Sequence, residues 1–387
     1  MNKPLELRKF VAPEFIFGTG ALEMTGRYAK NLGGEKALIV TDPGVIEAGW
    51  ADKVIASLNE QSIPYTVFSE VTPNPKDFEV MKGAEVFSAE ECNLIVTVGG
   101  GSPMDCAKGI GVVSSNGGYI LDYEGVDMIS NPIPPIICIP TTAGTSADVS
   151  QFAIIADIPN KTKIAIISKM LVPDVALVDP ETTTTMDSYL TACTGMDALT
   201  HAIEAYVSNA SSPVTDLLAL NAIRLISGNL IKAIENPFDL TYRTPMMLGS
   251  LEAGLAFSNA SLGAVHAMAH SLGGLMDLPH GECNAILLEY VVDYNFESSA
   301  ERYSGIAEAF GINISGISNV QKKNQLVDRI RTFRKNAGIL KSLHDIGVNP
   351  DSIGALSENA YKDPCLVTNP AEPTLNDIKE LYARAIG

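Results

Sequence analysis

The feature that most restricts the fold is an alternation, in the first half of the chain, between short apolar runs and stretches with helical spacing. Runs such as Lys36–Thr41, Tyr65–Phe68 and Leu94–Val98 have the length of strands, and a turn or a helical segment follows each of them. Strands that alternate with helices form a parallel sheet with helices on its faces. We therefore predict an α/β domain whose ligand crevice lies beyond the carboxyl ends of the strands.

The pattern changes after Pro180. Further strands are predicted at 135–139, 151–156, 163–167 and 175–178, after which the β-branched runs cease and helical patterns continue to the end. These predicted helices cover residues 187–208, 214–235, 244–260, 264–275, 323–338 and 374–386. Because 387 residues are too many for one compact core, we expect two domains: an α/β domain of residues 1–185 and an all-α domain of residues 186–387.

Composition excludes several classes of protein. A net charge of −18 argues against a nucleic-acid partner, since phosphates would be repelled. The six cysteines show no C-x-x-C spacing and lie mostly in apolar runs, as expected in a reducing compartment. The N-terminus, residues 1–9, lacks the apolar core of a signal peptide, and no segment approaches the roughly 18 uncharged apolar residues of a membrane span. We expect a soluble, cytoplasmic protein with no membrane partner.

A glycine-rich turn follows one of the predicted strands. It reads Gly99-Gly100-Gly101-Ser102-Pro103-Met104-Asp105 and is expected to open a helix at about Pro103. Three glycines allow a ligand to approach the backbone closely, and a helix N-terminus offers free N–H groups to a pyrophosphate. The turn matches neither the G-x-G-x-x-G fingerprint nor a Walker loop. A tight strand-to-helix turn without a ligand is the alternative interpretation.

Other polar residues follow predicted strands and could join the same crevice. Asp42 and Asn74 come after two of the strands, as Gly99 does after a third. The segment Pro140–Asp148 is rich in small hydroxyl residues directly after another strand. It could bind a phosphate or a ribose, although ordinary loops have the same composition.

Four of the five histidines fall in one stretch of the second half. Asp197 and His201 are one helical turn apart, and so are His266 and His270, so each pair projects from one helix face. His280 follows a proline, where a helix is expected to stop. The surrounding segments are almost free of charge, so the imidazoles should be buried. One carboxylate and several imidazoles favour a divalent transition metal; separate core or capping histidines are the alternative.

With these residues considered together, the chain resembles the iron-containing (group III) alcohol dehydrogenases over essentially its full length. The resemblance rests on Gly99-Gly-Gly-Ser-Pro-Met-Asp-Cys-Ala-Lys108, Pro140-Thr-Thr-Ala-Gly-Thr145, Gly195-Met-Asp-Ala-Leu-Thr-His-Ala-Ile-Glu204, His266-Ala-Met-Ala-His270, Pro279-His-Gly281 and Leu366-Val-Thr-Asn-Pro370. It implies that residues 1–185 form a dinucleotide-binding domain, that residues 186–387 form a helical metal-binding domain, and that catalysis occurs between them.

The resemblance also implies roles for individual residues. The implied metal ligands are Asp197, His201, His266 and His280. His270 is implied to lie beside the metal near the nicotinamide as a catalytic residue and not as a ligand. The implied cofactor-binding residues are Asp42, Asn74, Gly100, Gly101, Ser102, Thr141, Thr142, Ser150, Phe152, Lys163 and Thr182. Two positions depart from the family pattern: Ser150 replaces the usual threonine and keeps the hydroxyl, whereas Thr182 stands where leucine is frequent.

The implied chemistry suits these residues. A cation held by three neutral imidazoles and one carboxylate keeps a net positive charge and makes an alcohol oxygen more acidic, after which NAD can accept a hydride from the alcohol carbon. The metal implied by the family is Fe(2+), although this ligand set also suits Zn(2+) and other divalent metals. A carboxylate at Asp42 would accept hydrogen bonds from ribose and repel the 2′-phosphate of NADP.

The expected function is therefore that of an NAD-dependent alcohol dehydrogenase acting reversibly on a small primary alcohol or aldehyde. A polyol dehydrogenase of the glycerol or propanediol type is the nearest alternative. A lyase resembling dehydroquinate synthase is less compatible, because such a site needs basic residues near the ligand motifs. A metal- or nucleotide-binding protein without catalysis would not explain why both sites are complete. We also expect a homo-oligomer, a homodimer or larger.

Overall fold

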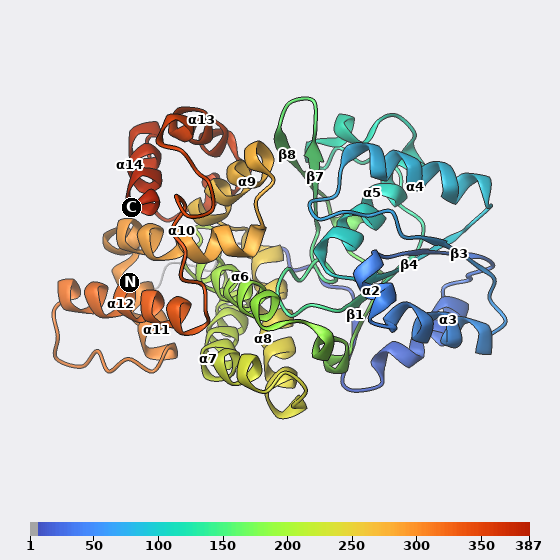
Figure 1. Ribbon diagram of the computed structural model, residues 1–387, viewed down its shortest axis with the longest axis horizontal. Coiled ribbons are helices and arrows are strands. Elements are labelled where there is room, and N and C mark those ends of the chain that lie inside the picture. Colours follow the sequence, from blue (N-terminus) through green and yellow to red (C-terminus); the bar gives the residue numbers. More distant parts are fainter. Residues whose placement is uncertain (1–6) are drawn as a thin grey trace.

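The computed structural model describes residues 7–387, so residues 1–6 of the N-terminal segment considered above lie outside the described residues. Figure 1 shows an α/β half, coloured blue to green, beside a helical half coloured yellow-green to red. All strands of the described residues precede Asp179, and the long helices of the second half begin at Ser188. The predicted fold class, a parallel sheet with flanking helices followed by a helical domain, is confirmed.

The main sheet has six strands in the order β1-β9-β6-β4-β2-β3, and every pairing in it is parallel. Its strands are β1 (Glu14–Phe17), β2 (Ala37–Val40), β3 (Tyr65–Phe68), β4 (Leu94–Gly99), β6 (Ile136–Pro140) and β9 (Val175–Val178). The central strands are buried on both faces, which explains why they read as continuous apolar runs.

Helices cover both faces of this sheet. They are α1 (Thr25–Asn31), α2 (Pro43–Glu47), α3 (Trp50–Glu60), α4 (Asp77–Ala89) and α5 (Gly101–Asn116). Alternate residues of β2 enter different cores, since Leu38 packs with Val80 of α4 and Ile110 of α5, whereas Ile39 packs with Val54 of α3. The carboxyl ends of β2, β4 and β6 therefore lie side by side at one edge, with α2 and α5 starting just beyond them.

A second, smaller sheet was not expected from the sequence. It has the order β5-β8-β7, with β5 (Gly125–Val126), β7 (Phe152–Asp157) and β8 (Thr162–Ile167), and β7 pairs with β8 in antiparallel fashion. Both long strands were predicted, but not their separate sheet. The reason is the connection: only residues 158–161 link them, and a parallel pairing needs a crossover of about a dozen residues.

The β7–β8 hairpin lies at the junction of the two halves, beside α9 (Ala264–Met276) (Figure 1). The approach is close at two glycines. A Cβ atom at Gly273 would come within 2.7 Å of Lys163 Cε, in a flexible side chain, and one at Gly274 within 2.8 Å of the backbone atom Thr162 Cα. Glycine is therefore required at Gly274, where the hairpin backbone cannot give way.

The second half is a bundle of helices around one core. It comprises α6 (Ser188–Val207), α7 (Pro213–Glu235), α8 (Leu240–Ala260), α9, α10 (His280–Asn295), α11 (Ala300–Ala309), α12 (Asn319–Asn336), α13 (Ile353–Lys362) and α14 (Leu375–Ile386). Within residues 7–387 one helix, α7, is long and apolar enough by composition to cross a membrane. Its Ile223, Ile226 and Leu230 pack into this bundle core.

Three of these helices, α10, α11 and α13, were not predicted. Helix α9 does end before Pro279, as expected, but His280 is not in a loop: Pro279 is the N-cap of α10 and His280 is its first residue. Proline is compatible with a helix start because the N–H it lacks would have no partner there. Helix α9 ends at Met276 with Asp277 as its C-cap, and Pro279 begins α10 and so fixes the position of His280.

Candidate active site

The first two predicted metal ligands lie on α6, a helix buried along most of its length. Asp187 caps its N-terminus by accepting a hydrogen bond from Leu190 N. Asp197 and His201 then project from the same face one turn apart, and both are at least 95% buried. Gly195, on the same helix, allows α7 to approach, since a Cβ there would lie 2.3 Å from Leu230 Cδ1.

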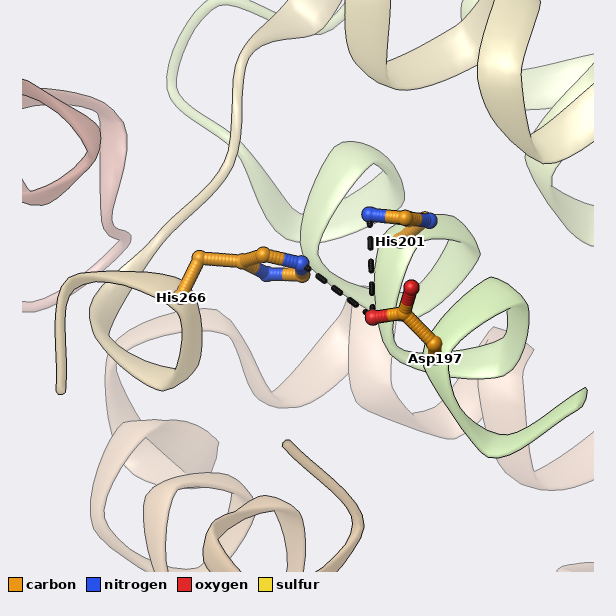
Figure 2. A group of neighbouring side chains, drawn as sticks. All are labelled: Asp197, His201 and His266. Atoms are coloured by element: carbon orange, nitrogen blue, oxygen red, sulfur yellow. Dashed lines mark ion pairs between the residues drawn. The ribbon is translucent and has the colours of Figure 1, made fainter. Parts of the chain in front are cut away.

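Two other helices bring the remaining imidazoles to Asp197. His266 comes from α9 and His280 from the first turn of α10. The Nε2 atoms of His201, His266 and His280 lie 3.9, 3.8 and 3.8 Å from Asp197 Oδ1. Figure 2 shows His201 and His266 directing their rings at this carboxylate oxygen. A cation with ligand distances of about 2.1 Å fits between atoms at these separations, so the donor set suits a divalent metal.

Glu204 fixes the orientation of His266. Its Oε2 lies 2.6 Å from His266 Nδ1 and accepts from Gly263 N at 3.0 Å, while its Oε1 accepts from Val265 N at 2.7 Å. The side chain is buried, so one carboxylate holds both the start of α9 and the ring. A proton held at Nδ1 leaves Nε2 free to face Asp197, the arrangement that metal-binding histidines usually have.

Burial and mutual charge determine the protonation of this cluster. Burial lowers the pKa of His201 to about 4 and puts the pKa of His280 well below its usual value. Burial alone would raise the pKa of Asp197, but the surrounding imidazoles lower it far below the usual range. Burial also opposes charge on His266, but Glu204 and Asp197 outweigh it and raise the pKa to about 9. A cation binds a carboxylate and neutral imidazoles, so Asp197, His201 and His280 are already in the binding form, whereas His266 would release a proton when a cation binds.

His270, the predicted catalytic residue, adjoins the four metal-ligand candidates. Its ring stacks on that of His280 with centroids 5.3 Å apart. Its Nδ1 lies 2.8 Å from Oδ2 of Asp363, whose other oxygen accepts from Cys365 N. Burial would raise the pKa of Asp363, but His270 lowers it. The carboxylate thus holds the ring from one side and leaves Nε2 available to the cavity.

Most predicted cofactor residues line one long cleft between the two halves, with a volume of about 800 Å³. The predicted residues that line it are Asp42, Asn74, Gly100, Gly101, Ser102, Thr141 and Thr142, and the cleft ends at Asp197 and His280. Asp42 also caps α2, since its Oδ1 accepts from Val45 N at 3.0 Å. Capping does not prevent the predicted contact with ribose, because the second carboxylate oxygen of Asp42 is not used by the cap.

The glycine turn forms the floor of this cleft. Helix α5 begins at Gly101, two residues before the predicted start at Pro103. A Cβ at Gly101 would lie 2.9 Å from Thr145 Cγ2, so only glycine allows the turn to pack against the 140–145 loop. The free N–H groups of the first turn of α5 consequently open into the cleft, where they can bind a phosphate.

The cleft leads to a smaller cavity of about 120 Å³ beside the histidines, lined by Ser150, Phe152 and Lys163 among the predicted residues. Lys108 positions two of them: it is fully buried and its Nζ donates to the carbonyl oxygens of Ser150 and Phe152 at 2.8 Å each. Lys163 donates to Asn74 Oδ1 at 2.7 Å, and burial lowers its pKa to about 8.

Thr182 is the one predicted cofactor residue that lies away from these cavities. It is fully buried, and its hydroxyl lies 2.6 Å from the carbonyl oxygen of Pro140 and 2.7 Å from that of Asp179. Thr182 therefore stabilises the turn that carries Thr141, without reaching the cleft itself. The one hydroxyl hydrogen of Thr182 donates to one of these carbonyl oxygens or is shared between them, and a leucine has no such donor.

A third cavity of about 310 Å³ opens on the other side of His270 and Lys163, both of which line it. The remaining wall is mostly polar and includes Glu124, Thr162, Ser271, Asn359, Lys362 and Asp363. The two shared residues thus separate a polar cavity from the cavity beside the metal-ligand candidates, whose apolar side is made by Phe152, Phe257 and Leu262.

Three residues of the site were not identified from the sequence: Glu204, Asn284 and Asp363. Glu204 follows His201 by three residues and Asn284 follows His280 by four, so helical spacing could have indicated both. Asp363 lies 93 residues from its partner His270, and no local pattern could have linked them.

Comparison with known proteins identifies the class. Residues 12–180 match the family model of iron-containing alcohol dehydrogenase, and residues 191–386 match the C-terminal model of the Fe-containing alcohol dehydrogenase family. The chain is 43% identical to the 1,3-propanediol dehydrogenase of Citrobacter freundii over 372 residues, 96% of each chain. It is 38% identical to the NAD-dependent methanol dehydrogenase of Bacillus methanolicus over 377 residues, 97% of this chain and 99% of that protein.

Solved structures agree with the sequence comparison. A crystal structure of 1,3-propanediol oxidoreductase superposes with a TM-score of 0.95 at 41% identity, covering 98% of this chain and 100% of that one. The chain belongs to the iron-containing alcohol dehydrogenase family. The predicted family and the predicted activity, that of an alcohol dehydrogenase, are both confirmed.

Proposed function

We propose that this chain is an NAD- and metal-dependent dehydrogenase that oxidises a small primary alcohol or diol and reduces the corresponding aldehyde. The observation that carries the proposal is Asp197 Oδ1 with three imidazole Nε2 atoms 3.8–3.9 Å away, at the end of a cleft that begins at Asp42. The similar protein of Bacillus methanolicus is named an NAD-dependent methanol dehydrogenase, which supports the choice of cofactor and of substrate class.

Asp197, His201, His266 and His280 would hold the metal. A divalent cation there would supply Lewis acidity, which makes an alcohol oxygen more acidic and polarises an aldehyde carbonyl. We propose iron as the native metal on the strength of the family name; zinc would bind the same donors. Metal analysis of protein purified without added metal separates the two.

Residues 1–185 would hold NAD, and residues 186–387 the metal. The two family models support this division, since one ends at residue 180 and the other begins at residue 191. NAD would supply the hydride acceptor. The α5 N-terminus would bind its pyrophosphate, Asp42 its adenosine ribose, and Lys163 and Asn74 would lie at the nicotinamide end of the cleft, where both contribute to the lining of the cavity beside the histidines.

The side chains around that cavity would position the substrate and control its protons. Phe152, Phe257 and Leu262 form an apolar wall that excludes water from the carbon that gives up the hydride. His270 Nε2 would hydrogen-bond the substrate oxygen or move its proton, with the ring kept in place by Asp363.

One observation favours a diol over a simple alcohol. Besides its apolar wall, the cavity beside the metal-ligand candidates is lined by the hydroxyl residues Ser102, Thr145 and Ser150, which offer hydrogen-bond partners to a second hydroxyl group. The 1,3-propanediol dehydrogenase of Citrobacter freundii, a close relative in sequence, supports this preference. Rates with 1-butanol, 1,3-propanediol, 1,2-propanediol and glycerol under saturating NAD test it, and the proposal predicts the highest kcat/KM for one of the diols.

The test of the site itself combines metal analysis with activity. Asp197→Ala removes the only anionic ligand and should lose both metal and turnover. Asp216→Ala, which breaks an ion pair with Arg302 away from the cavities, is the control and should retain both. Full metal occupancy in the Asp197 variant would exclude Asp197 as a ligand. The expected homo-oligomer and cytoplasmic location stay predictions, and light scattering in solution tests the first.

A further inference from the structure

Asn284 lies at the centre of the proposed metal site. It is on α10, one turn after His280, and is fully buried. Its amide nitrogen Nδ2 lies 2.6 Å from Asp197 Oδ1 and 3.1 Å from each of His266 Nε2 and His280 Nε2. These are three of the four atoms that would bind the cation.

The hydrogen bonds of this amide do not balance. An amide NH₂ group has two hydrogens, so it cannot donate to three acceptors at full strength, and it would face a second donor at any imidazole that carries a proton on Nε2. Its carbonyl oxygen, Oδ1, is buried and has no hydrogen-bond partner among the described residues. A buried carbonyl without a partner is costly and calls for an explanation. The Asn284 amide thus has more neighbouring acceptors than its NH₂ group can serve, while its own carbonyl oxygen has no donor.

A cation resolves both problems at once. A half-turn about the Asn284 Cβ–Cγ bond exchanges the positions of Nδ2 and Oδ1 and would present the carbonyl oxygen to the point where Asp197, His266 and His280 converge. Asparagine carbonyl oxygens are ordinary ligands of hard divalent cations, and transition metals such as zinc also accept oxygen ligands beside imidazoles. The three ligand atoms that face the NH₂ group would then coordinate the cation.

We propose that Asn284 is a fifth member of the metal site. Before the cation binds, its NH₂ group satisfies the ligand atoms and keeps them assembled; once the cation is bound, its Oδ1 faces the metal. This inference rests on the proposed metal site. If it holds, metal affinity depends on Asn284 as well as on the carboxylate and the three histidines.

Two substitutions and one control test the proposal. Asn284→Leu has a similar volume but neither polar atom, and Asn284→Asp has oxygens only. The control is Asn295→Leu, because Asn295 is also a buried asparagine of α10 but bonds to Asn369 and not to the ligand cluster. For each protein, the dissociation constant of Zn(2+) is measured by competition with a chelator, and Tm is measured with chelator and with excess Zn(2+).

We expect Asn284→Leu to raise the dissociation constant about 10- to 100-fold, the usual effect of removing a partner of metal ligands. Asn284→Asp should melt below the unmodified protein in chelator, because the new carboxylate lies against Asp197 and repels it. With Zn(2+) it should gain more in Tm than the unmodified protein does. Asn295→Leu should lower Tm in both conditions and leave the dissociation constant unchanged.

An unchanged dissociation constant in Asn284→Leu would overturn the proposal. If that variant does not fold, an Asn284→Asp protein whose Tm gain with Zn(2+) equals that of the unmodified protein would overturn it instead. If the unmodified protein itself binds no divalent metal, the proposed function fails, and this inference with it. Only the first two results count against Asn284 alone.

Discussion

The substitution Glu204→Gln tests how strongly the site depends on a residue that cannot touch the metal. Glutamine has the shape of glutamate but replaces one carboxylate oxygen by an NH₂ group. In the unmodified protein the carboxylate of Glu204 accepts hydrogen bonds from three groups: Gly263 N at 3.0 Å, Val265 N at 2.7 Å and His266 Nδ1 at 2.6 Å. One oxygen of glutamine cannot accept from all three, so at least one buried donor would face another donor.

The size of the effect follows from these contacts. A hydrogen bond to a charged group contributes about 1.5–3 kcal/mol, and a buried donor left without an acceptor costs about 1–3 kcal/mol. Since the remaining oxygen keeps part of the network, we expect Glu204→Gln to lower the free energy of unfolding by about 2–4 kcal/mol. The loss of orientation at His266 should weaken metal binding about 10- to 100-fold.

Urea unfolding in the presence of chelator measures the first quantity, and chelator competition measures the second. The control is Glu252→Gln on α8, where a single amide, Asn221 Nδ2, donates to the carboxylate at 2.8 Å. Glutamine can still accept this bond, so the control should cost less than about 1 kcal/mol. If Glu204→Gln is as mild as the control in both measurements, the carboxylate does not hold His266 and the proposed geometry of the site is wrong.

Three further predictions concern the cofactor and the histidines. Asp42→Asn keeps an acceptor for Val45 N but loses the charge, so it should raise kcat/KM with NADP and leave the cap of α2 intact; equal use of both cofactors before substitution would refute the role of Asp42. His270→Ala should retain metal and bind NAD but lower kcat about 10²- to 10⁴-fold, whereas His266→Ala should lose metal; equal metal loss in both would make His270 a ligand. Lys163 has a pKa of about 8, so it is charged below that pH and increasingly neutral above it. The rate at which Lys163 is acylated, followed by mass spectrometry, should therefore level off near pH 9, whereas the rates of exposed lysines rise to about pH 10.4. Bound NAD should lower the rate at Lys163. If the midpoint of its pH–rate curve lies above pH 10, the lowered pKa of Lys163 is wrong.

The parallel sheet and the pairing of site residues on one face of a helix could be predicted because both depend on local periodicity. A strand buried on both faces reads as a short apolar run, and residues four apart on a helix share a face. Asp197 and His201 needed only α6 to be a helix. The relative placement of α6, α9 and α10 could not be read from such patterns. The prediction that Asp42 lies in the ligand cleft rested only on the general geometry of parallel sheets.

What was missed depends on contacts between distant segments or on weak patterns. The separate β7–β8 sheet was missed although the four-residue connection at 158–161 was visible. Helix α10 was missed for two reasons. Pro279 was considered only as the end of a helix, and the charged residues of α10 interrupt its apolar pattern. The pairing of His270 with Asp363 joins residues 93 apart in the chain and depends on how α9 packs against the segment after α13.

The contact between the β7–β8 hairpin and α9 has a mechanical consequence. At Gly274 the helical half meets the backbone of Thr162 and Lys163 directly, at a separation where a single methyl group would collide with that backbone. Interfaces this tight do not slide, because any shift brings backbone atoms into overlap. The junction therefore resists sliding, and any opening of the cleft would require one half to rotate against the other. A bulkier residue at Gly274 would push the hairpin away from α9 and so change the relative placement of the two halves.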